Sequence, residues 1–556
     1  MLTPAAASAA AGDLDPTFGT GGKRVLPGTE QPLDVFVQPD GKIVTVAGQN
    51  ALFSSFKGFL VRRVLPDGSP DRSFDGDGAA TATFPNIPQN STLDPKAAAL
   101  QPDGGVVVAG NASGAAGSAV AVARFASDGS LDKTFDEGGA DGDGRAVING
   151  AFAGFGPSDV VLQPGGKLAL VGTQGNDSDF GVVRLRSDGS VDGTTFDPGD
   201  FADHSDTAIA AAQSPDGTMV VVGTTDGTPG TTVTGVVRYR SDGKLDTSLA
   251  GTGKTTITSI DSPAAVIVQP DGKVLVAGSA GQFGDRKLII TRVTREGNVD
   301  TTFGTGGSAE IGDKGRDNSA NAIVLQPDGK IIVSGSSSGT VENATFDALV
   351  ARLDSTGQLD PSYGSGGRVS ISFGDIGLGG PAALQPDGKL VVLGLGVASG
   401  LVPRPVLARL LADPPAGPAA SGGGGDQPST QQPQPQTQPG QGGVTDTPAD
   451  TVAPRLSALR VVASGKARRR LVARFTLSEP ARVRFTLQRL PRRGRARAVP
   501  GSFSVAGLPG AARLDIGGRR VVRRLAPGRY RLVATPTDAA GNRGAATRAG
   551  FTVARK

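Results

Sequence analysis

The side chains that most often perform covalent or metal chemistry are nearly absent from this sequence of 556 residues. It contains no Cys and one His, His204. Without Cys the chain has no thiol nucleophile, no disulfide and no Cys-bound zinc or iron–sulfur cluster, and one His excludes a multi-histidine metal site. His204 stands in a polar segment with acidic neighbours, where a surface histidine is the ordinary interpretation. Much of metal and nucleophilic chemistry is therefore excluded.

Arg and Asp are the charged residues that recur with regular spacing. Seven arginines each end an apolar run: Arg63, Arg124, Arg184, Arg238, Arg292, Arg352 and Arg409. Seven aspartates occupy one place in connections of the type Leu-Asp-x-Thr-Phe-Gly: Asp15, Asp71, Asp132, Asp192, Asp246, Asp300 and Asp360. A charged residue that is present in every unit is more simply explained by a structural role than by catalysis, because a protein needs an active site only once. We expect each Arg to form a bidentate ion pair with the Asp of an adjacent connection and so to join one unit to the next.

The aromatic position of the same connection has an equally simple interpretation. It holds Phe18, Phe74, Phe135, Phe196, Phe303 and Tyr363, with Leu249 in the fifth copy. Large apolar rings at one place in every unit predict core packing between units.

The elements that position these residues come from a repeat. A Gln-Pro-Asp-Gly-Lys segment between apolar runs occurs seven times, two copies being degraded, with intervals of 51 to 63 residues. It predicts a β-hairpin, because Pro presets the turn and Gly supplies positive φ. With the strand that ends in Arg and one more after each Gly-Gly, every unit has four short strands, the content of a propeller blade. The sequence thus predicts an all-β fold, a seven-bladed β-propeller over residues 13–411, with almost no helix.

The ends of this region indicate a closed ring. The Leu-Asp-x-Thr-Phe-Gly connection is missing after Arg409, and the extra copy stands before the first hairpin, at Leu14 to Gly19. A unit that begins in mid-motif and ends where that motif is missing is completed when the N-terminus fits beside the last unit.

Both motifs closely resemble those of the delta-60 repeat family, bacterial β-propeller-like repeats. The resemblance covers about 400 of the 556 residues. It implies an exported or surface-associated protein, and it brings no catalytic residue with it.

The rest of the chain falls into three parts. Residues 1–12, rich in Ala, are expected to be a signal-peptide remnant or a disordered tail, with export favoured. Residues 412–451, rich in Gly, Pro and Gln, are expected to be a disordered linker. Residues 452–556 alternate Arg with apolar side chains, which predicts a small β-sandwich with a cationic face. Its Ala526-Pro527-Gly528-Arg529-Tyr530 segment looks like bacterial immunoglobulin-like or fibronectin-like modules.

Charge separates this last part from the others. Residues 452–556 have 25 Lys+Arg and 3 Asp+Glu, whereas the remainder has 31 and 49. The densest basic positions are candidates for binding an anionic polymer: Lys466, Arg468, Arg469, Arg470, Arg492, Arg493, Arg495 and Arg497. Nucleic acid is a poorer partner, because no recognition helix or aromatic stacking pattern accompanies the arginines. A merely solvating surface is the alternative.

Other sites have weak signals. The acidic loops Asp75 to Gly78 and Asp136 to Gly144 could offer oxygens to Ca²⁺, but they lack EF-hand spacing and solvated turns are the simpler interpretation. Otherwise no cofactor is expected. No apolar run has the roughly 18 residues of a membrane span.

These observations favour a non-enzymatic, monomeric protein that is secreted or at the cell surface. The propeller would be a platform for a protein or other ligand, and the basic sandwich would associate with an anionic cell-envelope polymer. Two alternatives stay open: a hydrolase or lyase that uses Asp/Glu at the central channel, and a structural surface protein without a specific ligand.

Overall fold

The computed structural model describes residues 10–413 and 455–553, each with gaps. The gaps in the first stretch are residues 50–57, 85–86, 88–91, 115–116, 136–141, 149–154, 175–178, 195, 202–205, 215, 227–230, 340–345, 375 and 398–402. Those in the second are residues 465–469, 478–480, 491–495, 508–509, 516–524 and 538–542. The chain forms two compact units that divide after Ala416. Apart from Ala412 and Asp413, the predicted linker lies outside the described residues.

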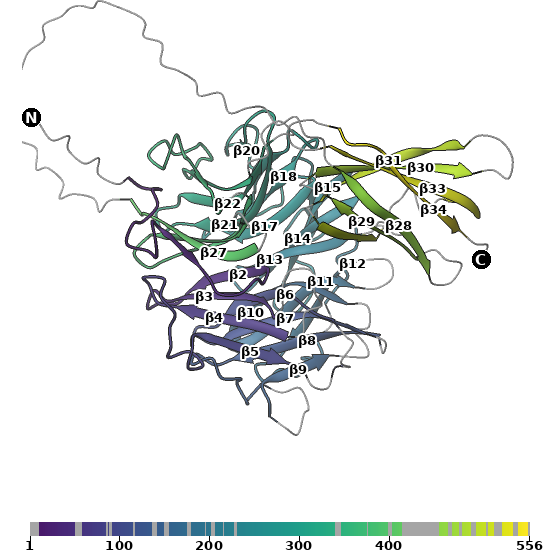
Figure 1. Cartoon of the computed structure of the whole chain (residues 1–556). Helices are drawn as coiled ribbons and strands as arrows, with labels where there is room; N and C mark the ends of the chain where they lie inside the picture. Colours follow the sequence, from purple (N-terminus) through teal and green to yellow (C-terminus); the bar gives the residue numbers. More distant parts are fainter. Residues whose placement is uncertain are drawn as a thin grey trace, which may run out of the picture. The chain divides into compact units, whose positions relative to one another are not determined.

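The first unit is the predicted seven-bladed β-propeller (Figure 1). Blade 1 consists of β2 (Pro32–Val37), β3 (Ile43–Gly48), β4 (Gly58–Val64) and β5 (Ala79–Thr83). Blade 2 consists of β6 (Thr92–Leu100), β7 (Val106–Gly114), β8 (Gly117–Phe125) and β9 (Arg145–Ile148). Blade 3 consists of β10 (Gly156–Gln163), β11 (Lys167–Gln174) and β12 (Asp179–Leu185). Blades 4 and 5 consist of β13 (Thr207–Gln213), β14 (Met219–Asp226), β15 (Thr232–Tyr239) and β16 (Lys254–Ile257); and β17 (Ser262–Val268), β18 (Val274–Ala280), β19 (Lys287–Val293) and β20 (Ser308–Ile311). Blades 6 and 7 consist of β21 (Asp317–Leu325), β22 (Ile331–Ser338), β23 (Phe346–Leu353) and β24 (Arg368–Ile371); and β25 (Ile376–Leu384), β26 (Leu390–Val397), β27 (Pro403–Leu410) and β1 (Lys23–Val25).

The sheets stack face to face around a ring. Each blade's innermost strand contacts that of the next blade, and β25 contacts β2, so the ring closes. A middle strand such as β3 is buried at every position because it has a neighbouring sheet on both faces. The expectation of four strands per unit fails in blade 3, where β10, β11 and β12 are the strands of the described residues. In place of a fourth strand, the Gly199 N–H reaches the Phe180 carbonyl at 3.4 Å.

The N-terminus completes blade 7, as the motif order predicts. β1 pairs with β27, with Lys23 opposite Ala408, and Leu14 forms an isolated bridge with Leu410. The predicted boundaries, however, are too narrow at both ends. Ala11 is buried, and its carbonyl accepts the Gly364 N–H at 2.9 Å. The described part of the segment expected to be a tail therefore belongs to the propeller.

The Pro-Asp-Gly turns have the geometry that the repeat predicts. Gly41 has a φ of +81°, which favours glycine. The Asp40 carboxylate accepts the Lys42 N–H at 3.2 Å, and Asp271 holds Lys273 in the same way at 3.1 Å. These turns place one Lys at the same point in most blades.

The second unit is the predicted small β-sandwich. One sheet has the order β28 (Leu456–Ser464), β29 (Arg470–Leu477), β32 (Gly510–Asp515), and the other has the order β31 (Arg497–Gly507), β30 (Ala481–Leu490), β33 (Gly528–Thr537), β34 (Thr547–Val553). Alternate residues such as Ala473, Phe475, Val483 and Phe485 form its core. The described residues of the whole chain include no α-helix, and hence no helix long and apolar enough to cross a membrane.

Candidate functional site

The recurring Arg and Asp meet in every blade. In each pair an arginine Nε lies 2.5 to 2.9 Å from the Oδ2 of an Asp. In six pairs the Asp is in the connection that follows the strand of its Arg, and in the seventh it comes from the N-terminal copy of the connection: Arg63–Asp71, Arg124–Asp132, Arg184–Asp192, Arg238–Asp246, Arg292–Asp300, Arg352–Asp360 and Arg409–Asp15. The expected bidentate geometry is wrong. Only Nε meets the Asp, because the other nitrogens have partners elsewhere.

Those other nitrogens join one blade to the next. Arg292 Nη1 donates to the Ser355 carbonyl of the following repeat at 2.8 Å, and Arg238 does the same with Arg295 at 2.7 Å. The second terminal nitrogen reaches the Ser or Thr two residues after the Asp, as in Arg292 to Thr302 Oγ1 at 3.2 Å. The link between blades therefore runs through a backbone carbonyl and not, as expected, through the Asp.

Lys of the Pro-Asp-Gly-Lys turn is a partner that the sequence motif alone did not reveal. Five Lys Nζ atoms lie 2.9 to 3.5 Å from the same Asp Oδ2: Lys42–Asp71, Lys167–Asp192, Lys273–Asp300, Lys330–Asp360 and Lys389–Asp15. Repeats 2 and 4 have Gly105 and Thr218 at this position. Their aspartates, Asp132 and Asp246, are the most exposed of the seven, at 26% and 18% against 2 to 11% for the others.

An aromatic ring lies under most of the guanidinium groups. Arg292 Cζ is 4.6 Å from the centroid of Phe303, and Arg409 Cζ is 4.7 Å from that of Phe18. Both rings are fully buried, as the core interpretation predicted. On Phe303 a glycine of the next repeat packs closely, since a Cβ added to Gly357 would stand 2.8 Å from the ring. Of the seven positions, Phe196 is the one that is partly exposed.

Blade 6 varies this arrangement. Asp413, just past the predicted end of the propeller, takes the place of the carbonyl and accepts from both terminal nitrogens of Arg352, at 2.8 and 2.7 Å. Arg352 is fully buried, and Lys330 also lies 3.3 Å from Asp413. A cluster of four charged side chains therefore lies at the C-terminal end of the propeller: Lys330, Arg352, Asp360 and Asp413.

The ion clusters keep their aspartates ionised. Burial alone would raise the pKa of Asp71, but the hydrogen bonds from Ser73 and the charge of Arg63 outweigh it and lower the pKa to about 2. Asp15 and Asp360 have pKa values of about 2 for the same reasons, with Lys389 and Lys330 contributing. These three aspartates are each held by an arginine and by a Ser or Thr, which is the bonding expected of structural ion clusters.

The central channel is where the repeat loses its symmetry. A cavity of about 300 Å³ is lined by the innermost strands of all seven blades. Beside the β-bulge of these strands, one equivalent position holds Asp34, Ala97, Asp159, Ala210, Ala265, Ala322 and Pro381. Two carboxyl groups therefore face a channel that is otherwise walled mainly by alanine and aliphatic side chains.

The two channel carboxyl groups have different partners. Asp159 accepts the Val160 N–H and, from the next blade, the Ala211 N–H, both at 2.7 Å. Asp34 accepts the Val35 N–H at 2.8 Å. Burial raises the pKa of Asp34 to about 8, against the Val35 N–H and with a further increase from the charge of Asp159. Burial likewise raises the pKa of Asp159 to about 6. Both carboxyl groups thus hold a proton to higher pH than usual, as the acids and bases of active sites often do.

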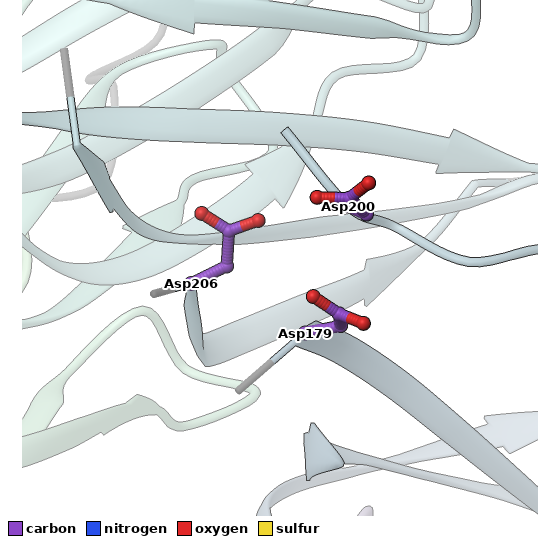
Figure 2. A group of neighbouring side chains, drawn as sticks. All are labelled: Asp179, Asp200 and Asp206. Carbon is purple, nitrogen blue, oxygen red and sulfur yellow. The ribbon is translucent and has the colours of Figure 1, made fainter. Parts of the chain in front are cut away.

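A group of three carboxylates lies in the irregular blade 3 to blade 4 region. Asp179 begins β12, Asp206 precedes β13 and is fully buried, and Asp200 lies between them in sequence. Figure 2 shows the three side chains side by side, and a ligand oxygen of each lies within 4.8 Å of the others. Asp206 Oδ2 also accepts the Phe201 N–H at 2.9 Å. Oxygen donors of this kind are those that Ca²⁺ or Mg²⁺ takes.

This is not where Ca²⁺ ligands were expected. In the predicted loop Asp75 to Gly78, the Asp77 carboxylate instead accepts the Ala79 N–H at 2.8 Å, which is the geometry of an ordinary turn. Most of the second predicted loop, residues 136–141, lies outside the described residues, as does His204.

The predicted basic positions of the sandwich are described in part. Lys466, Arg468, Arg469, Arg492, Arg493 and Arg495 lie outside the described residues. Arg470 begins β29, and Arg497 begins β31 and is exposed. Strand alternation brings further arginines to the outer faces, among them Arg529 and Arg548, which are exposed.

Comparison with known proteins agrees with the repeat count. Seven segments match a family described as "Domain of unknown function (DUF5122) beta-propeller": residues 38–74, 101–135, 163–194, 214–249, 269–303, 326–363 and 385–413. Seven segments of the chain, one for each blade, are therefore similar to a β-propeller repeat. No curated protein matches the sequence.

Solved structures resemble the chain more distantly. A protein of unknown function from Dyadobacter fermentans has 13% identity and a TM-score of 0.39, covering 70% of this chain and 99% of that one. The α-L-arabinofuranosidase Arb93A from Fusarium graminearum has 11% identity and a TM-score of 0.37, covering 58% and 93%. An α-L-arabinanase from Penicillium chrysogenum has 14% identity and a TM-score of 0.32, covering 59% and 96%.

Proposed function

We propose that this seven-repeat propeller protein is a non-enzymatic binding protein of the cell surface or the secreted fraction. It acts as a monomer. The propeller is a rigid interaction platform, and the basic sandwich attaches the chain to an anionic polymer of the cell envelope.

The observation that carries the proposal is the charge of the four-stranded sheet. Its strands β30, β31, β33 and β34 contain no Asp or Glu. Arg529 and Arg531 alternate on β33, and Arg548 on β34 is diagonal to Arg531, because Arg531 pairs with Gly550 and Arg548 with Val533. Clustered arginines without acidic neighbours attract polyanions at long range.

The charges of the propeller also favour the sandwich as the part that attaches to the polymer. Its recurring Arg, Asp and Lys are bound to one another inside the blades, as described above.

The sandwich also has features of immunoglobulin-like modules, which are common surface domains. In β30, β33 and β34 the order is that of strands C, F and G, and the Tyr530 hydroxyl donates to the Ala526 carbonyl at 2.7 Å, as in a tyrosine corner.

Co-sedimentation of the full chain with isolated bacterial envelopes tests the proposal. A variant with Arg529, Arg531 and Arg548 replaced by Gln should lose most of its binding. A control loses three exposed propeller arginines instead, through Arg186→Gln, Arg240→Gln and Arg295→Gln, whose side chains are 51%, 54% and 62% exposed. The control should bind normally. Failure of the wild-type chain to sediment would contradict the proposal and favour a structural protein without a ligand.

A second candidate is a hydrolase or lyase that works in the central channel. The observation in its favour is the pair Asp34 and Asp159, two carboxyl groups of one channel whose pKa values are raised by burial. Incubation of the full chain with a panel of polysaccharides, assayed for new reducing ends or unsaturated products, tests it. Activity lost in Asp34→Asn and kept in Asp226→Asn, which changes an exposed residue of β14, would support it; no product from any polymer would count against it.

A further inference from the structure

The three-stranded sheet of the second unit places three arginines in one row. Arg460 of β28 is directly opposite Arg474 of β29, and Arg474 is directly opposite Arg513 of β32. Arg460 and Arg474 are exposed, whereas Ala473 and Phe475 on either side of Arg474 are buried in the core. Arg460 and Arg474 therefore lie on the outer face of the sheet, and Arg513 is the position of β32 that pairs with Arg474.

This arrangement is unfavourable for the sheet alone. Directly opposite residues of antiparallel strands have Cβ atoms about 5 Å apart, and like charges at that distance destabilise the pairing. The sequence from residue 452 onward has three acidic residues, Glu479, Asp515 and Asp538. Of the described residues of this unit, Asp515 on β32 is the acidic one, and it is opposite Val472. The described part of the sheet thus has three arginines in the row against one carboxylate.

We propose that Arg460, Arg474 and Arg513 form a binding row for a linear polyol-phosphate polymer. This rests on the proposed function, in which the sandwich attaches to an anionic polymer; it adds a contact on the three-stranded sheet to that of the four-stranded sheet and names the chemistry of the ligand. A guanidinium group pairs with phosphate through two parallel hydrogen bonds, and successive phosphates of one chain can neutralise successive arginines across the strands. Binding of the phosphates would therefore relieve the repulsion between neighbouring arginines of the row.

The described aromatic residues of this unit argue against single-stranded nucleic acid. Phe475, Phe485, Tyr530 and Phe551 are all buried in the core. Binding of unpaired bases usually relies on exposed rings on which the bases stack. A phosphate polymer without bases needs only the charges.

The test compares two single substitutions in the full chain. Arg474→Gln removes the centre of the row. Arg543→Gln removes an exposed arginine outside the strands of both sheets, which is opposite Thr537 and so has no arginine directly across from it. Both variants lose one charge. Affinity for poly(glycerol phosphate) is measured by calorimetry, and amide hydrogen exchange is measured without polymer.

The proposal predicts opposite effects of Arg474→Gln on the two measurements. The affinity should fall on the order of tenfold, because a charge-assisted contact at the centre is lost. Exchange in β28, β29 and β32 should slow, because repulsion is relieved. Arg543→Gln should weaken binding by no more than about threefold, as expected for an exposed charge, and should leave exchange in these strands unchanged.

Three results would overturn the binding row. Equal losses of affinity in the two variants would mean that binding is diffuse, while the proposed function stands. Faster exchange in Arg474→Gln would mean that this arginine is held by a partner within the protein. Tighter binding of single-stranded DNA than of poly(glycerol phosphate) would replace the ligand class. If the wild-type chain binds no poly(glycerol phosphate) even at low salt, the proposed function itself loses its support.

Discussion

Arg409 and Asp15 are 394 positions apart in the sequence, and their side chains meet at an Nε–Oδ2 distance of 2.9 Å. Lys389 lies 3.1 Å from the same carboxylate oxygen. In the other blades the equivalent Asp follows its Arg after eight residues, as in Arg63 and Asp71. The ring is thus closed by the contact that stabilises each blade, with its acid supplied from the opposite end of the chain.

Asp15→Asn should therefore destabilise the propeller strongly. It leaves the charges of Arg409 and Lys389 without their buried carboxylate, a change that costs about 3 to 5 kcal/mol for a buried pair. Asp132→Asn is the matched control, because Asp132 is 26% exposed and has no Lys partner, so its loss should be clearly smaller. Chemical denaturation of the full chain measures both. Equal losses would show that closure depends on the β1–β27 pairing alone.

The turn Lys can be tested by exchanging it between blades. Thr218→Lys gives blade 4 the residue that blade 5 has in Lys273, so it should place an ammonium beside Asp246 and stabilise the fold by up to about 1 kcal/mol. Lys273→Thr should have the opposite effect through Asp300. The pKa of Asp246, already below its usual range, should fall further in Thr218→Lys. Carboxyl chemical shifts followed with pH would check this, and an unchanged titration would exclude the contact.

Acid should unfold the propeller through its ion clusters. The pKa of Asp15, Asp71 and Asp360 is about 2 in the folded chain, below the ordinary value of 3.8. A carboxyl group with a lowered folded pKa stabilises the fold above its unfolded pKa, and this contribution is lost as the pH falls toward the folded value. We expect the melting temperature to drop steeply between pH 4 and pH 2. A flat profile in this range would contradict the low pKa values.

The channel acid should have the opposite pH dependence. Because burial raises the pKa of Asp34 to about 8, the folded chain holds a proton that the unfolded chain releases near pH 4, and stability falls as the pH rises between these values. Asp34→Asn mimics the neutral form. The variant should match the wild-type melting temperature near pH 4 and exceed it at pH 8. A constant difference between the two proteins would mean that Asp34 titrates normally.

The periodic features of this protein were predictable from its sequence. The hairpins and the positions of Arg and Asp recur seven times, and repetition identifies them without knowledge of the fold. The closure by the N-terminus follows from the copy of the connection that stands before the first hairpin. Lys42 and its equivalents were visible in the motif, but their contact with the Asp depends on how the turn folds back. The hydrogen bond from an arginine to a backbone carbonyl of the next blade was unpredictable, because every residue has a carbonyl and the sequence does not mark the one that accepts.

The non-periodic features had no such signal. Asp34 and Asp159 belong to blades 1 and 3 and face one channel because the ring brings the inner strands together. Asp179, Asp200 and Asp206 come from the region where blade 3 loses its fourth strand, so no repeat aligned them. Asp413 stands where the composition already resembles the linker, and its contact with Arg352 extends the propeller past the boundary that composition suggested.

The salt dependence of envelope binding tests the central claim most directly. Electrostatic attachment through the sandwich predicts that the full chain co-sediments with isolated envelopes at low ionic strength. It also predicts that the chain is released progressively as salt shortens the screening length, from about 30 Å at 0.01 M to about 3 Å at 1 M. Binding that persists unchanged at the highest salt, or no binding at the lowest, would contradict this account.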